Sequence, residues 1–154
     1  MLVKLNAEDN LPGGFALDEA VQVAGRLSDS GIDAIEISAG TPASGDESPV
    51  RMTIDSPEKE AYNLNQARKI KEAVQCPVMV VGGIRSYEVA EEAVGEDWID
   101  YVSMARPLIR EPDLPNRWKD GDRKPATCIS CNSCFGPGLK EGGIYCVVKK
   151  DEEK

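Results

Sequence analysis

The sequence contains no histidine, so the usual general base of enzymes is missing from its 154 residues. This absence excludes Ser-His-Asp and Cys-His catalytic arrangements and zinc sites with histidine ligands. Long apolar runs are also lacking, and none approaches the ~20 residues that span a bilayer. The opening MLVKLNAEDN has no apolar segment typical of a secretory signal. We therefore expect a cytoplasmic protein without a membrane partner.

Positive charge is scarce as well. Lys and Arg number 18 against 27 Asp and Glu, which leaves a net charge of −9. Such a balance disfavours nucleic acids and anionic surfaces as partners. Hydrophobic residues at 41% and charged residues at 29% are ordinary for a folded domain, and the length suits one hydrophobic core. The composition predicts an acidic globular protein that does not bind nucleic acid.

Short β-prone segments alternate with helical patterns along the first two thirds of the chain. The predicted strands are residues 2–5, 34–38, 77–81 and 99–104. Apolar residues at helical spacing predict helices over residues 17–30, 57–74 and 86–94. This alternation implies parallel strands joined by right-handed crossovers. Both a doubly wound sheet and part of a (β/α) barrel fit the pattern.

Two further segments depart from this alternation. Residues 40–54 are polar and long for a strand-to-helix connection, so they form either a functional loop or a mobile surface loop. After Arg106, prolines and Gly121 break up the chain, with one short helix predicted at residues 114–118. We divide the chain into an α/β unit over residues 1–120 and a cysteine-rich tail over residues 121–154.

The tail carries four cysteines at the spacing C-x2-C-x2-C-x11-C, namely Cys128, Cys131, Cys134 and Cys146. Three closely spaced thiolates followed by a distant fourth are typical of ferredoxin-type ligation of a 4Fe–4S cluster. Zinc sites more often use two separated C-x2-C pairs, so zinc and the absence of any metal are the alternatives. Cys76 stands apart and is interpreted as a small buried hydrophobic residue.

Two neighbouring strand ends carry features of an anion site. Gly82 and Gly83 follow the third predicted strand and precede a helix, where backbone N–H groups can approach an anion closely. Ala105 and Arg106 follow the fourth strand. The pair of strand ends matches the phosphate site of many (β/α)8 barrels. The alternatives are a simple tight turn for the glycines and a salt-bridged rim position for Arg106.

Five stretches of sequence occur in the order of a known family, namely VKLN, GIDAIEISAG, PVMVVGGIRS, IDYVSMARPLIREPDLPNRW and CISCNSC. Together they resemble the C-terminal half of Old Yellow Enzyme-like flavin oxidoreductases. The iron–sulfur branch with 2,4-dienoyl-CoA reductase and trimethylamine dehydrogenase is the most similar. The resemblance covers about residues 2–148 and implies half of a (β/α)8 TIM barrel, strands five to eight, followed by the cysteine-rich tail. It also implies FMN at the strand ends and NAD(P)H as reductant.

The resemblance implies a role for each matching residue. Lys4, interpreted as lying at the end of the first strand, would face the flavin pyrimidine. The main chain of Gly82, Gly83 and Ala105, with Arg106, would hold the FMN phosphate. The four tail cysteines would hold a 4Fe–4S cluster near the flavin. Ala105 stands where many relatives have glycine, which adds a methyl group but leaves the backbone donors. No catalytic residue is assigned.

The length is the main departure from the family. Relatives carry four further strands and the acid that protonates the substrate in an N-terminal half. Four strands cannot close a barrel, and they leave two open edges. A fragment, one subunit of a split enzyme and a dimerising half-barrel all fit. We expect self-association or pairing with an N-terminal half, driven by an uncovered apolar face with Val3, Ile35, Val80 and Val102.

The leading hypothesis is an FMN- and 4Fe–4S-binding part of an NAD(P)H:flavin oxidoreductase, similar to ene-reductases and not catalytically complete alone. The alternative is a non-catalytic iron–sulfur or zinc module for electron relay or assembly. A phosphate-sugar enzyme is disfavoured by the absence of histidine. Several acidic residues are interpreted as rim or capping charges: Asp33, Glu36, Asp97 and Asp100.

Overall fold

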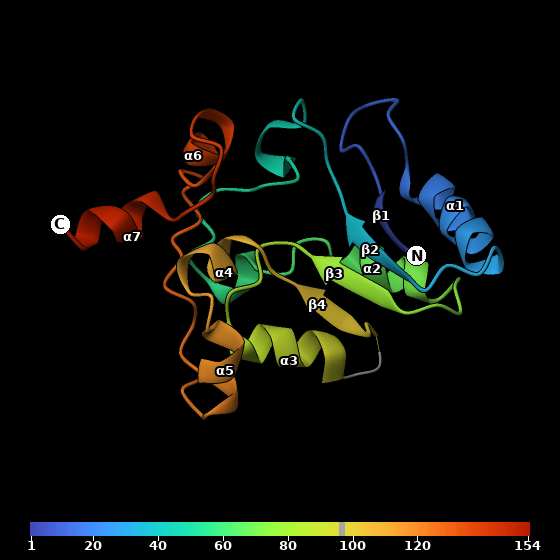
Figure 1. Cartoon of the computed structure of the whole chain (residues 1–154). Coiled ribbons are helices and arrows are strands. Elements are labelled where there is room, and N and C mark those ends of the chain that lie inside the picture. Colours follow the sequence, from blue (N-terminus) through green and yellow to red (C-terminus); the bar gives the residue numbers. More distant parts are fainter. Residues whose placement is uncertain (96–97) are drawn as a thin grey trace.

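The computed structural model describes residues 1–95 and 98–154, and Asp97 lies outside the described residues. The four predicted strands are present as β1 (Leu2–Asn6), β2 (Ala34–Ser38), β3 (Val78–Val81) and β4 (Tyr101–Ser103). They form one parallel sheet in the order β1-β2-β3-β4 (Figure 1). The predicted parallel α/β arrangement is therefore confirmed, because each strand reaches its neighbour through a crossover.

The sheet is connected by α1 (Leu17–Asp29), α2 (Leu64–Lys71) and α3 (Tyr87–Gly95). Four shorter helices follow β4: α4 (Arg106–Arg110), α5 (Leu114–Lys119), α6 (Phe135–Lys140) and α7 (Val147–Glu152). Helix α5 confirms the short helix predicted there. In Figure 1, α6 and α7 lie at the opposite side of the view from α1. None of the helices that the structure describes has the length and apolarity needed to cross a membrane.

The single helix predicted over residues 57–74 is wrong. A 3-10 turn at Pro57–Lys59 is followed by a break in which Ala61 has φ +48°, and α2 begins only at Leu64. At the break, the buried Glu60 carboxylate accepts hydrogen bonds from the backbone N–H groups of Arg85 and Ser86, both at 2.8 Å. These long-range bonds to the loop after β3 outweigh the local preference for a continuous helix.

The core lies between the sheet and the helices. Ile35 pairs with Val78 and Ile37 with Val80 in the register, and all four side chains are fully buried. The buried residues of α1 and α2 that join this core are Ala20, Ala24, Ala67 and Ile70. Residues at alternate strand positions share one face of a sheet, so these strand residues form the face that the helices cover.

The expectation of an uncovered apolar face is therefore wrong for the residues that it named. Ile35 and Val80 have no exposed surface, and Val102 packs against the same core. Val3 is paired with Ile35 in the register and so lies on the same face. These four apolar residues therefore lie on the face of the sheet that the chain's own helices cover, which removes most of their surface from water.

The opposite face of the sheet carries a mixed row of side chains. The register aligns Lys4 with Glu36, Glu36 with Met79, and Met79 with Tyr101. Lys4 forms an ion pair with Glu36, and Tyr101 is 57% exposed. Lys4 lies at the middle of β1 and not at its end. The face without helices is thus more polar than the sequence pattern suggested.

Candidate functional site at the ends of β3 and β4

A pocket of about 130 Å³ opens where β3 and β4 end. Its lining includes three of the predicted phosphate-site residues, Gly83, Ala105 and Arg106, together with Ser103. Pockets for drug-sized ligands are commonly ~300–1,000 Å³. The space therefore suits one small group of a ligand, such as a phosphate, and is too small for a whole cofactor.

The two glycines have a structural requirement of their own. Gly83 has φ +70°, and a Cβ there would lie 2.8 Å from Cε1 of Tyr62. A Cβ on the buried Gly82 would lie 3.1 Å from the backbone nitrogen of Asn63. Close packing of the segment before α2 thus requires glycine at position 83 and leaves little room for a side chain at position 82, whatever they bind. Gly83 lines the pocket, whereas Gly82 lies behind it.

Helix α3 follows the glycine turn, but the donors of the two residues just before it are already used. The N–H groups of Arg85 and Ser86 and the Ser86 hydroxyl all donate to Glu60, with the last bond at 2.6 Å. The predicted favourable dipole at this helix start therefore faces an internal carboxylate. Binding of an anion in the pocket would depend on the turns at Gly83 and Ala105 and on the Arg106 side chain.

Arg106 connects this pocket to the cysteine motif. Its Nη1 donates to Oδ1 of Asn132 at 2.7 Å and to the carbonyl of Arg51 at 2.8 Å. Asn132 lies between two of the cysteines, and its Nδ2 donates to the Val50 carbonyl at 3.1 Å. The N–H of Thr53 also donates to the Ser130 carbonyl, at 3.3 Å. These bonds hold the end of the 40–54 loop against the site, which argues against the alternative of a mobile surface loop.

All four tail cysteines line a second pocket, which also includes Arg106. Its remaining lining is Ile109, Arg110, Ile129, Asn132, Ser133, Val147 and Val148. Within residues 1–95 and 98–154, no three His, Cys, Asp or Glu side chains are arranged to hold a single metal ion. In a four-iron cluster each cysteine binds a different iron, so the sulfurs need not converge on one point. The four-thiol donor set is compatible with such a cluster.

The cysteine environments differ in polarity. A hydrogen bond from Ser133 lowers the pKa of Cys131 below its ordinary value, and the charge of Arg106 adds to this effect. Burial raises the pKa of Cys134. Ser130 and Asn132 have φ of +54° and +60°, so the backbone turns sharply between successive cysteines. This turning directs three thiols of one short segment into a single pocket.

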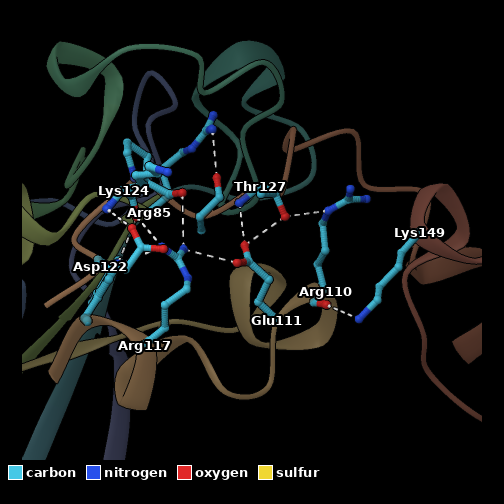
Figure 2. Close-up of polar contacts among 11 residues, drawn as sticks. Arg85, Arg110, Glu111, Arg117, Asp122, Lys124, Thr127 and Lys149 are labelled. Carbon is cyan, nitrogen blue, oxygen red and sulfur yellow. Dashed lines mark hydrogen bonds and ion pairs between the residues drawn. The ribbon is translucent and has the colours of Figure 1, made fainter. Parts of the chain in front are cut away.

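Arg110, which lines the cysteine pocket, belongs to a network of polar side chains (Figure 2). Nε of Arg110 donates to Oγ1 of Thr127 at 2.8 Å, and its Nη1 donates to Sγ of Cys146 at 3.6 Å. The Thr127 hydroxyl and Nη2 of Arg117 both donate to Glu111, at 2.9 and 3.1 Å. Burial works against the charge of Arg110, but its bonds to Cys146 and its other partners hold its pKa above the ordinary value.

Arg110 and Glu111 are functional candidates that the sequence did not reveal. Both belong to the MARPLIREPDLP stretch, which indicated the family without assigning these side chains. Only the fold brings Thr127 against α4, so no spacing in the sequence could have identified the contacts. The structure does not bring Lys4 to the other predicted site residues. It lines neither pocket and lies on β1, at the other edge of the sheet from β4.

Several known proteins are similar to this chain in sequence. The chain is 33% identical over 135 residues to NADH oxidase of Thermoanaerobacter brockii, covering 86% of the chain and 20% of the relative. It is 29% identical over 154 residues to a metal reductase of Desulforamulus reducens, covering 98% of the chain and 22% of the relative. The chain therefore spans about a fifth of the length of these relatives.

Solved structures agree on the fold. A 2-naphthoyl-CoA reductase complex matches 85% of the chain and 20% of its own, with a TM-score of 0.69 and 30% identity. Histamine dehydrogenase from Rhizobium sp. 4-9 matches 96% of the chain and 21% of its own, with a TM-score of 0.77 and 21% identity. The old yellow enzyme homologue from Zymomonas mobilis matches 77% of the chain and 31% of its own, with a TM-score of 0.54 and 20% identity. A family model described as the NADH:flavin oxidoreductase / NADH oxidase family matches residues 3–124, most of the chain, and the protein therefore belongs to that family.

Proposed function

We propose that this chain is the FMN-phosphate- and 4Fe–4S-binding part of an NAD(P)H:flavin oxidoreductase. Its strands would be the fifth to eighth of a (β/α)8 barrel, with residues 1–120 as the barrel portion and 121–154 as the cluster-binding tail. One observation carries the proposal: Arg106 lines both the small pocket at the strand ends and the pocket with all four tail cysteines. Family membership supports FMN and a nicotinamide reductant.

The residues of the small pocket fit the phosphate end of FMN. The main chain of Gly83 and Ala105 would hold phosphate oxygens, and Arg106 would add a charge-assisted hydrogen bond. Gly82 would act indirectly, by allowing the tight packing behind the turn. Lys4 would supply a cation on the helix-free face of the sheet for the flavin pyrimidine. FMN, when bound, supplies hydride and electron chemistry.

The residues of the second pocket fit a 4Fe–4S cluster. Cys128, Cys131, Cys134 and Cys146 would be its ligands, and the cluster would supply single-electron transfer. The apolar part of the lining consists of two isoleucines and two valines. The two arginines of the pocket offset the negative charge that four thiolates bring together.

The remaining barrel strands would come from the rest of a longer chain, from a second copy or from a separate N-terminal half. β1 and β4 are the two edge strands of the sheet, and edge strands present backbone groups to another chain. The relatives that the chain matches are about five times longer, so turnover by this chain alone is not expected. No residue of the chain is proposed as the substrate acid.

Anaerobic reconstitution tests the proposal. Wild-type protein is incubated with iron, sulfide and FMN, and each component is quantified after gel filtration. We expect about four irons per chain, as a four-thiolate cluster implies, together with weakly bound FMN. Stoichiometric zinc that iron cannot displace would contradict the cluster. A fully loaded cluster without FMN binding would instead support the electron-relay module.

A further inference from the structure

We propose that Arg110 is a positioning residue of the cluster, which holds the distant fourth ligand Cys146 and raises the reduction potential by donating to its sulfur. The inference rests on the proposed function, because it concerns the same cysteine pocket. It goes further by assigning a side chain that is not a ligand. Arg110 is one of two arginines in the lining of this pocket.

The first support is the geometry of the guanidinium. Its three nitrogens each have a different acceptor: Oγ1 of Thr127 at 2.8 Å, Oε2 of Glu152 at 2.6 Å and Sγ of Cys146 at 3.6 Å. The side chain is only 12% exposed. Arginine does not lose its proton in proteins, so the donor to sulfur is permanent. Two oxygen acceptors on other segments therefore orient the third N–H toward the thiol.

The second support is the way in which Arg110 joins separate segments. Cys146 is the residue before α7, far along the chain from the other three cysteines. Two residues of α7 bond to Arg110: Lys149 donates to the Arg110 carbonyl at 3.2 Å, and Glu152 accepts from the Arg110 guanidinium. Thr127, which precedes Cys128, accepts from Nε. Arg110 thus ties the segment of the first ligand to the segment of the last.

The expected effect follows from charge. Hydrogen bonds to the ligand sulfurs and nearby positive charge raise the potential of an iron–sulfur cluster, because the cluster gains one electron on reduction. A partly buried cation acts more strongly than one in water. Removing the charge and the donor should lower the equilibrium constant for one-electron reduction about tenfold, which corresponds to about 59 mV.

The experiment compares full-length wild type with Arg110→Gln, Arg110→Lys and the control Arg117→Gln. Arg117 bonds Glu111 in the same network but does not line the cysteine pocket, so its loss perturbs the network alone. Each protein is reconstituted with iron and sulfide, and its potential is measured by anaerobic dithionite titration with mediator dyes. We expect all variants to take up as much iron and sulfide as wild type. The equilibrium constant for one-electron reduction should fall about tenfold in Arg110→Gln and by less in Arg110→Lys, and it should not change in Arg117→Gln.

Several outcomes decide the inference. A fully loaded Arg110→Gln protein with the wild-type potential overturns it. If Arg110→Gln loses the cluster, restored loading in Arg110→Lys with full loading in Arg117→Gln supports the positioning role. If all three variants lose the cluster to the same extent, the network is merely structural and the inference is overturned. If wild type takes up neither iron nor sulfide, the proposed cluster itself fails, which distinguishes the two failures.

Discussion

Arg106 lines both the pocket at the strand ends and the cysteine pocket. Its guanidinium is partly buried, with its Nη1 bonded to Asn132 and to the Arg51 carbonyl, yet it also lines the pocket at the strand ends. A fixed guanidinium loses little conformational freedom when it binds an anion. A phosphate recognised there should therefore depend strongly on this one side chain.

Substituting Arg106→Ala should weaken FMN binding about tenfold or more, because a charge-assisted hydrogen bond contributes ~1.5–3 kcal/mol. Riboflavin lacks the phosphate, so it should bind wild type more weakly than FMN and be insensitive to the substitution. Fluorescence titration of both flavins measures this. Asn132→Ala is the comparison: it removes one partner of Arg106 but keeps the charge, so it should weaken FMN binding less than Arg106→Ala. Equal affinity for FMN and riboflavin would remove the phosphate assignment.

Glu111 gives the tail a dependence on pH. Burial opposes its ionisation, but the bonds from Thr127 and Arg117 outweigh burial and hold its pKa below the ordinary value. The ionised form is thus favoured by folding. Its stabilising contribution is complete above the unfolded pKa of ~4.3 and is lost as the pH falls through the lower folded pKa.

Glu111→Gln should therefore cost about 1–2 kcal/mol of unfolding free energy at neutral pH, as expected for hydrogen bonds to a charged group. The difference from wild type should shrink as the pH falls below ~4. Urea unfolding at a series of pH values provides the measurement. A cost that stays constant down to ~pH 3 would show that the ionised carboxylate is not what stabilises the network.

At the scale of elements, the break before α2 is what positions the end of β3. Glu60 leaves the helical path, and its carboxylate satisfies two N–H groups at the start of α3. Tyr62 then packs against Gly83, and its N–H donates to the Gly82 carbonyl at 3.2 Å. The pocket at the strand ends therefore depends on a segment that is distant in sequence.

Glu60→Ala should destabilise the fold by about 2–5 kcal/mol, because it leaves the N–H groups of Arg85 and Ser86 without their acceptor. Chemical denaturation measures the change. Glu58→Ala is the matched control, since Glu58 is exposed two residues earlier and its loss should cost about 0.5 kcal/mol or less. A similar small cost for both variants would contradict the role given to Glu60.

At the scale of the whole molecule, the sheet has one face covered by helices and one that is open to a partner. The open face includes Leu2 at 67% exposure and Tyr101 at 57%, on the two edge strands. Edge strands combined with exposed apolar side chains favour association between chains.

The isolated chain should therefore form a dimer or a larger species in light scattering over a range of concentrations. Tyr101→Lys should shift the distribution toward monomer, because it places a charge on the edge strand β4. Val23→Lys on α1 serves as the control, since Val23 is also partly exposed, at 38%, but lies on a helix. A compact monomer at high concentration would count against this expectation.

The sequence by itself determined the features that depend on neighbours along the chain. The four strands and their parallel order follow from short apolar runs that alternate with helical patterns, and the helices α1 and α3 lie close to their predicted bounds. The motifs were sufficient to identify the family. Period and spacing are local properties, so they can be read without a fold.

Only the tertiary structure decided which groups meet across the chain. Four features depend on contacts between segments that are distant in the sequence. They are the strand face that the helices cover, the break at Glu60, the packing of Tyr62 against Gly83 and the contact of Arg110 with Cys146. A buried donor or acceptor takes whichever partner the packing brings within reach, because leaving it unbonded costs ~1–3 kcal/mol. That cost is set by three-dimensional proximity, to which the local sequence pattern has no access.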